Sequence, residues 1–323
     1  MRRYPIPHTD LRASRIAYGC MQLSRAWDDS DPPPGERRQA ALLIETALEQ
    51  GINLFDHADI YARGKSERLF GDWLAAAPSR RDGLILQSKC GIRFAHDPHP
   101  DSPGRYDFSH VHLLASVEGS LRRLRTDYLD LLLLHRPDPL GVPEEVARAF
   151  DDLHRSGKVR HFGVSNHTGG QIALLQAHLA QPLVGNQIEL SLLHHHLINE
   201  GVIAATTGAA YTASAGTLDD CRRLGLLVQA WSPLAGGRLS HPETAEPALR
   251  PTAEAVAAMA ARHGVSAEAI LLAWLLRHPA GIQPVIGTTR PERLVAACAA
   301  DAVELSREEW YALFTAARGG PVP

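Results

Sequence analysis

Residues 128–135 read YLDLLLLH, and this stretch decides the fold. Apart from Asp130 it is apolar until His135, so a strand formed here would be buried on both faces. Such strands are typical of parallel sheets covered by helices, whereas strands with one solvated face alternate apolar and polar residues. The stretch therefore predicts a protein of the α/β class.

Short apolar runs of the same kind recur along the whole chain. The predicted strands are Ile16–Gly19, Asn53–Asp56, Leu84–Ser88, Leu129–Leu134, Phe162–Val164, Val184–Ile188, Leu227–Trp231 and Pro284–Ile286. Amphipathic stretches separate them, and we expect helices over Glu36–Gln50, Lys65–Ala77, Ser109–Leu124, Pro143–Ser156 and Thr168–Leu179. Gly51 and Gly157 follow two of these helices, as capping glycines do. Eight strands that alternate with helices predict a single (β/α)8 TIM barrel domain over residues 1–323.

Two other layouts are compatible with 323 residues. The chain could form two ordinary domains, but no linker-like change of composition divides it. A doubly wound sheet also alternates strands and helices, but a glycine-rich dinucleotide-binding turn usually follows its first strand. Residues 17–24 read AYGCMQLS, with a single glycine. The single barrel is therefore favoured.

Charge and composition limit the classes of partner that the chain is expected to bind. Its 33 basic and 36 acidic residues are mixed along the sequence and give a formal net charge of -3, which argues against a nucleic-acid partner. No apolar run reaches the roughly 18 residues of a membrane span, so we expect a cytoplasmic protein without a membrane partner. The four cysteines lack the paired spacing of a zinc site, and no metal is expected. The sequence leaves the oligomeric state open, with a monomer favoured.

One segment interrupts the alternation of strands and helices. Residues 199–217 read NEGVIAATTGAAYTASAGT and lack a sustained apolar period, so they are expected to form a loop insertion after the sixth strand. Such a loop could be a lid over the active end of the barrel or a surface loop without function, and the sequence does not decide between them. The preceding run from His194 to His196 is expected to be a polar loop, because three neighbours rarely point at one metal ion.

Polar side chains stand where three predicted strands end. They are Asp56, Lys89 and His135, and Tyr61 follows Asp56 closely enough to fold back over the barrel. Each alone has an ordinary structural explanation, but active sites of such barrels lie at the carboxyl ends of the strands. Four chemically matched groups at this end therefore predict a catalytic site without a metal.

These four groups suit the reduction of a carbonyl by hydride. The reaction leaves negative charge on oxygen, so a proton donor must be at hand. Tyr61 can donate that proton, and the Lys89 ammonium is expected to favour its phenolate. Asp56 can hold Lys89 protonated and oriented, while His135 can position the substrate oxygen.

Six motifs resemble those of aldo-keto reductases in the same order, across roughly Ile16 to Arg293. They read FDHADIY, LILQSK, LLLLHRPDP, HFGVSNHT, NQIELSLLHH and AWSPLAGGRL. The resemblance is to the bacterial oxidoreductase branch and to members similar to potassium-channel β-subunits. It implies NADPH-dependent reduction of an aldehyde or ketone to an alcohol, with Asp56, Tyr61, Lys89 and His135 as catalytic tetrad and Tyr61 as general acid.

The same resemblance implies how NADPH (NADP+) would be held. Ser165, Asn166 and Gln187 would bind the carboxamide, and Trp231 would stack on the nicotinamide ring. The residues that would surround the pyrophosphate are Ser232, Pro233, Leu234, Gly236, Gly237 and Arg238. Those that would hold the adenosine 2′-phosphate are Gly287, Thr288, Thr289 and Arg293, with Arg290 as a helper. Ala296 and Ala297 depart from the Glu and Asn that many relatives use near adenine.

Two other functions stay open at this stage. A regulatory subunit could keep the cofactor pocket with little turnover, although the full tetrad disfavours it. A lyase could use Lys89 to form a Schiff base, although Tyr61 and Trp231 fit that idea poorly. The expected partner is a small-molecule carbonyl substrate, which the sequence does not identify.

Overall fold

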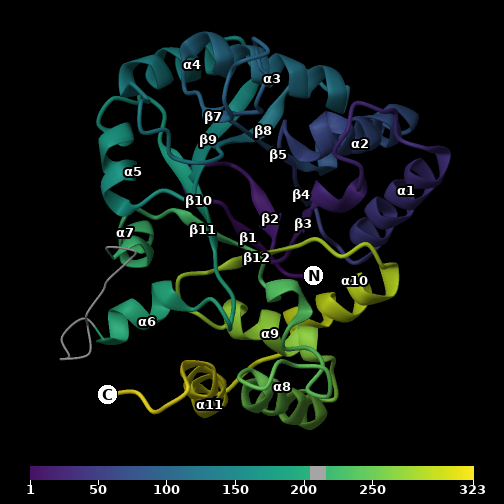
Figure 1. The fold of residues 1–323 in the computed structure, drawn as a ribbon, viewed down its shortest axis with the longest axis vertical. Coiled ribbons are helices and arrows are strands. Elements are labelled where there is room, and N and C mark those ends of the chain that lie inside the picture. The colour runs from purple at the N-terminus through teal and green to yellow at the C-terminus, as the bar shows by residue number, and fades with distance from the viewer. Residues whose placement is uncertain (204–215) are drawn as a thin grey trace.

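The computed structural model describes residues 1–203 and 216–323 and contains a closed barrel of eight parallel strands (Figure 1). Around the barrel the strands are β3 (Ala17–Gly19), β4 (Leu54–Asp56), β5 (Ile85–Cys90), β8 (Leu129–Leu134), β9 (Val159–Ser165), β10 (Leu183–Glu189), β11 (Leu227–Trp231) and β12 (Gln283–Ile286). β12 pairs with β3 and closes the ring. The predicted (β/α)8 fold is therefore confirmed. Each predicted strand is present: β8 and β11 have the predicted bounds, and the ends of the others differ by one to three residues.

Helices surround the barrel, as the covered strands require (Figure 1). They are α1 (Pro34–Glu49), α2 (Lys65–Ala76), α3 (His110–Leu124), α4 (Pro143–Arg155), α5 (Gly169–Gln176), α6 (His196–Ile203), α7 (Thr217–Arg223), α8 (Arg250–His263), α9 (Ala267–Leu276), α10 (Pro291–Cys298) and α11 (Arg307–Arg318). Among the described residues no single helix is long and apolar enough to span a membrane, and only α8 and α9 together, bent by 92°, meet that measure.

The amino end of the barrel is filled by apolar side chains. An antiparallel hairpin of β1 (Arg3–Pro5) and β2 (Arg12–Ser14) precedes the first barrel strand. Ile6 and Leu11 of this hairpin pack with inward side chains of the strands, such as Leu54, Leu131 and Leu227. Because the interior is closed at this end, the opening of the barrel lies at the carboxyl ends of the strands.

A polar layer lies above this apolar floor. Gln87 and Gln187 each donate a hydrogen bond to Gln229, at 2.9 and 3.1 Å, and Gln229 donates to Gln283 at 2.9 Å. Gln87 and Gln187 also donate to Asp56 Oδ1, at 2.5 and 3.1 Å. These buried amides therefore connect five strands and fix the orientation of the Asp56 carboxylate.

The predicted insertion over residues 199–217 differs in part from expectation. Helix α6 extends to Ile203 and α7 begins at Thr217, so the first residues of the segment are helical. Residues 204–215 lie outside the described part of the chain, and with them most of the predicted loop. In the preceding run, His194 ends a bend, His195 follows it and His196 begins α6. Within the described ranges no cluster of His, Cys, Asp or Glu could hold a metal ion.

Candidate active site

Lys89 joins the carboxylate of Asp56 to the phenol of Tyr61. Its Nζ donates hydrogen bonds to Asp56 Oδ2 at 2.8 Å, to Tyr61 OH at 3.0 Å and to the backbone oxygen of His57 at 2.9 Å. The His135 ring lies edge-on to that of Tyr61, with 5.8 Å between ring centroids. The structure thus brings together the four side chains that the sequence places near strand ends.

Strand register explains why Asp56 and Lys89 meet. Asp56, the last residue of β4, pairs in register with Gln87 of β5. Side chains two residues apart on a strand point the same way, so Gln87 and Lys89 both face the Asp56 carboxylate. Lys89 is only 1% exposed, and a buried ammonium needs such an anionic partner.

A tight turn folds Tyr61 back over the barrel. Ala62 and Arg63, directly after Tyr61, have φ of 47° and 55°, and Gly64 has φ of 80°. Left-handed backbone is unfavourable for residues other than glycine, so contacts must hold this turn. One of them is the hydrogen bond from Arg63 Nε to the backbone oxygen of Trp27, at 3.1 Å.

Burial has the largest effect on the pKa of Tyr61. Burial raises the pKa of Tyr61, and the nearby Lys89 ammonium only partly opposes that shift. Lys89 favours the phenolate, as expected, but burial outweighs it, and Tyr61 therefore stays protonated at neutral pH. For Lys89, burial acts in the opposite direction and lowers the pKa. The interactions with Asp56 and Tyr61 outweigh burial, so the pKa of Lys89 is raised. A protonated Lys89 with three acceptors is no nucleophile, which argues against the Schiff-base lyase.

His135 is a neutral imidazole. Burial and the charges of Lys89 and Arg136 hold its pKa well below the ordinary value. Its Nδ1 is buried without a hydrogen-bond partner among the described residues. A neutral ring can still donate one hydrogen bond, and His135 lines the cavity beside Tyr61.

These groups open into a cavity of about 750 Å³ at the carboxyl ends of the strands. The predicted site residues that line it are Asp56, Tyr61, His135, Ser165, Asn166, Gln187, Trp231, Ser232, Pro233, Leu234, Gly236, Gly237, Gly287, Thr288, Thr289 and Arg293. Lys89 is buried beside Tyr61, and Arg238 does not line the cavity. Arg238 Nη2 instead lies 2.9 Å from Glu246 Oε1 in an ion pair.

The three predicted carboxamide ligands are linked to one another and to Trp231. Asn166, with φ of 62°, donates from Nδ2 to Ser165 Oγ at 2.9 Å and to the backbone oxygen of His135 at 3.1 Å. Its Oδ1 accepts a hydrogen bond from Trp231 Nε1 at 2.9 Å. Ser165 Oγ donates to the backbone oxygen of Gln187 at 2.8 Å. The network fixes these side chains against the cavity wall next to the tetrad.

Cationic side chains gather where the cavity meets α10. Arg290 and Arg293 line it here, and within the described part of the chain neither has an ion pair. Arg25, from the loop after β3, also lines it and donates from Nη2 to Thr289 Oγ1 at 3.1 Å. Gln39 donates to the backbone oxygen of Thr289 at 2.9 Å. Arg25 was missed by the sequence analysis, since nothing in its local pattern indicates a contact with residue 289.

The glutamines of the polar layer were missed as well, apart from Gln187. A signal for them is present in the sequence, because one glutamine interrupts each of the apolar runs at positions 87, 187, 229 and 283. Arg136 was also overlooked, although it directly follows His135 and lines the cavity.

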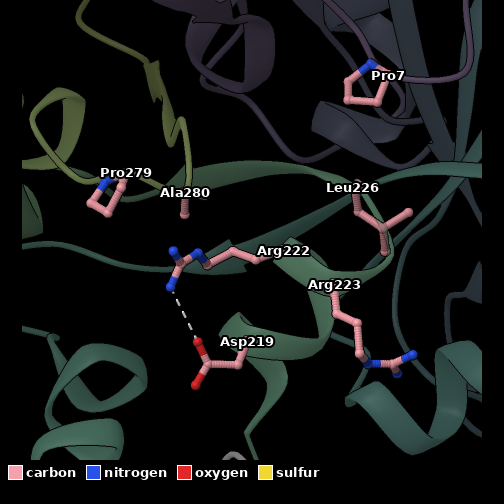
Figure 2. A pocket seen from close by; sticks show the side chains of 8 residues that line it. Pro7, Asp219, Arg222, Arg223, Leu226, Pro279 and Ala280 are labelled. Carbon is pink, nitrogen blue, oxygen red and sulfur yellow. Dashed lines mark hydrogen bonds and ion pairs between the residues drawn. The ribbon is translucent and has the colours of Figure 1, made fainter.

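A second hollow, of about 530 Å³, lies at the opposite end of the barrel (Figure 2). Leu226, which directly precedes β11, and Ala280, shortly before β12, line it. Its Arg222 forms an ion pair with Asp219 at 3.4 Å, as Figure 2 shows. None of the predicted site residues lines this hollow.

The fold and the grouping of Asp56, Lys89, Tyr61 and His135 at the carboxyl ends define a barrel enzyme of the oxidoreductase class. The sequence matches the aldo/keto reductase family over residues 15–317. The chain therefore belongs to the aldo/keto reductase family.

Similar proteins extend this assignment over the whole chain. The chain is 40% identical over 321 residues to the uncharacterized oxidoreductase YcsN of Bacillus subtilis, with 97% of both chains covered. It is 39% identical over 322 residues to a 6-dehydroglucose reductase of Novosphingobium aromaticivorans, with 98% of this chain and 95% of that one covered. The glycerol dehydrogenase structure from Gluconobacter oxydans has a TM-score of 0.81 at 24% identity, over 99% of this chain and 97% of that one, and supports the fold alone. The chain is thus an NAD(P)H-dependent oxidoreductase of carbonyl compounds.

Proposed function

We propose that the protein reduces an aldehyde or ketone to an alcohol with NADPH, and that Tyr61 is the general acid. The observation that carries the proposal is the Lys89 ammonium, which lies 2.8 Å from Asp56 Oδ2 and 3.0 Å from Tyr61 OH at the cavity wall. Because Lys89 donates to the phenol oxygen, the phenol hydrogen is free to point at a substrate oxygen.

The tetrad would transfer one proton and stabilise the negative charge that remains. A bound reduced nicotinamide supplies hydride. As the carbonyl oxygen gains negative charge, Tyr61 donates its proton to that oxygen. Lys89 stabilises the phenolate that remains, and Asp56 keeps Lys89 protonated and in place. Neutral His135 donates a hydrogen bond to the same oxygen and orients it toward Tyr61.

The donor groups along the cavity fit a nicotinamide dinucleotide. Ser165, Asn166 and Gln187 would hold the carboxamide, although their present hydrogen bonds within the protein must partly exchange for it. Trp231 would stack on the ring. The residues proposed for the pyrophosphate are Ser232, Pro233, Leu234, Gly236 and Gly237. We leave Arg238 out of this proposed set, because Glu246 already pairs with it.

The preference for NADPH over NADH is proposed from the end of the cavity near α10. Arg290 and Arg293 are cations without an ion pair among the described residues, beside the hydroxyls of Thr288 and Thr289. Arginine forks and hydroxyls suit a phosphate dianion. We add Arg25 to this set, because it already contacts Thr289.

Substitution of Arg293 tests the cofactor assignment. In a fluorescence titration, Arg293→Ala should weaken NADPH binding by about tenfold or more and leave NADH binding within about twofold, since the lost contact is a charge-assisted hydrogen bond. Arg307→Ala, on the exposed start of α11, is the matched control and should change neither affinity. An unchanged NADPH preference in Arg293→Ala would place the phosphate site elsewhere.

Turnover is tested with a panel of carbonyl compounds. NADPH oxidation should accompany reduction of at least one aldehyde, and sugar-derived aldehydes belong in the panel because one relative is named a 6-dehydroglucose reductase. Tight NADPH binding without oxidation across the panel would favour the regulatory subunit instead.

A further inference from the structure

We propose that Arg136 determines substrate specificity by binding an oxygen-bearing substituent of the carbonyl substrate, either a carboxylate or a group of hydroxyls. The inference rests on the proposed function and adds to it the class of substrate. It concerns a residue outside the tetrad and outside the residues proposed to hold the cofactor.

Arg136 stands at the catalytic end of the cavity. It directly follows His135 at the end of β8, is half-buried and lines the cavity. Its guanidinium carbon lies 5.8 Å from the ring centroid of Trp231. Its charge also helps to lower the pKa of His135, as expected for a cation next to the tetrad. A substituent on a carbonyl held by Tyr61 and His135 would therefore lie within reach of this guanidinium.

The guanidinium of Arg136 has no hydrogen-bond acceptor within the described part of the chain. Over residues 1–203 and 216–323 its side chain makes neither an ion pair nor a hydrogen bond. Asp138, the carboxylate on the same loop, accepts from the backbone N–H groups of Phe108 and Leu140 instead, at 3.0 and 2.9 Å. Asp56 is occupied by Lys89 and two glutamines. A guanidinium that faces the cavity and has no carboxylate partner among the described residues is available to pair with a ligand.

Apolar side chains form part of the cavity wall, and Arg136 adds a charged contact for a substituent. Ile60, next to Tyr61, and Ile92, shortly after Lys89, line the same cavity with apolar side chains, and Met21 and Trp27 also line it. Aliphatic walls cannot pair with hydroxyls or a carboxylate. A planar guanidinium offers a fork of donors that fits two oxygens at once. We therefore expect Arg136 to discriminate oxygen-rich carbonyl compounds from plain ones.

Matched substrate pairs test this inference. The hydroxyl pair is glyceraldehyde and propanal, and the carboxylate pair is succinic semialdehyde and butanal. Arg136→Met should lower kcat/KM by about tenfold or more for the oxygen-rich member of at least one pair, and by less than about threefold for its plain partner. Arg136→Lys, which keeps the charge but loses the fork, should recover part of that loss.

Two controls separate specificity from general damage. NADPH affinity should be unchanged in Arg136→Met, and Arg155→Met, an exposed arginine of α4, should behave as the unchanged protein. A selective loss of kcat/KM for glyceraldehyde would identify a sugar-like substituent as the group that Arg136 binds. A selective loss for succinic semialdehyde would identify a carboxylate. Equal loss, or no loss, for both members of both pairs would overturn the inference.

A binding readout keeps the inference distinct from the proposed function. The intrinsic fluorescence of the NADP+-saturated protein is titrated with glyceraldehyde and succinic semialdehyde, which needs no turnover. Binding that depends on Arg136 without NADPH oxidation would contradict the proposed function and support the role of Arg136. NADPH oxidation together with substrate binding that does not depend on Arg136 would support the proposed function and contradict the role of Arg136.

Discussion

At the scale of single residues, the central relation is that between Lys89 and Tyr61. The buried ammonium does not make Tyr61 a phenolate at neutral pH, because burial raises the phenol pKa more than Lys89 lowers it. In the proposed mechanism, Lys89 instead offsets the cost of the phenolate that forms when the proton has left. We therefore propose that Lys89 stabilises the charge that develops during the reaction and does not ionise Tyr61 beforehand.

The pH dependence of the reduction follows from the raised pKa of Tyr61. A phenol is the proton donor below its pKa and loses that capacity as the pH rises through it. Because the pKa of Tyr61 lies above its ordinary value, kcat/KM for reduction should be constant between about pH 6 and 9 and should fall only at higher pH. Rates with a substrate that has no ionisable group measure this. A fall centred near neutral pH would show that another group is the acid.

Sequence reasoning could predict that the four proposed catalytic side chains meet, because strand ends in a barrel are predictable from apolar runs. Each of Asp56, Lys89 and His135 follows such a run. Once the barrel fold is predicted, their proximity at the carboxyl ends of the strands can be predicted too. Arg25 could not be found in this way, because its contact with Thr289 joins residues 264 positions apart through a loop. The placement of Arg238 depended on a loop with left-handed residues on either side of Pro233 and Leu234, whose path local sequence does not define.

At the scale of helices and strands, a glycine lies at the close contact of α2 and α3. A Cβ added at Gly71 of α2 would lie 2.0 Å from the backbone oxygen of Arg123 in α3. Backbone atoms cannot move aside as a flexible side chain can, so only glycine allows these two helices to approach so closely.

Substitution of Gly71 tests this contact. Gly71→Ala should lower the free energy of unfolding by about 1–3 kcal/mol or more, through forced separation of α2 and α3. Gly83→Ala is the matched control, because a Cβ there meets nothing within 4 Å. Chemical denaturation of both variants measures the difference. Equal stability of the two variants would contradict the packing described for α2 and α3.

The elements themselves were largely predictable from apolar periodicity. β8 matches its predicted bounds because its run of leucines has clear ends. β9 begins at Val159, before the predicted Phe162, because Arg160 and His161 interrupt the apolar run without interrupting the strand. Helix α6 was not predicted, since Asn199 and Gly201 make its eight residues weakly helical by propensity.

At the scale of the whole molecule, most strands of the barrel contribute residues to the cavity wall. Residues that line the cavity come from β3 through Gly19, from β4 through Asp56, and from β12 through Ile286. A ligand in the cavity would therefore contact parts of the chain that are distant in sequence. We propose that the chain behaves as one domain, as the predicted barrel requires.

Thermal unfolding with NADPH tests that proposal. At a concentration about 100 times its Kd, NADPH should raise the free energy of unfolding by about 2.7 kcal/mol, because it binds only the folded barrel. The whole unfolding transition should shift to higher temperature as a single step. Two transitions, of which NADPH shifts only one, would contradict a single domain.

The most direct test of the central claim is the turnover of Tyr61→Phe, measured together with its NADPH affinity. The substitution removes one hydroxyl and keeps the aromatic ring, so the fold and the cavity wall should persist. We expect kcat to fall by about 100-fold or more while the Kd for NADPH changes by less than about threefold. Near-normal turnover, or an equal loss of turnover and NADPH binding, would contradict the role of Tyr61 as the proton donor.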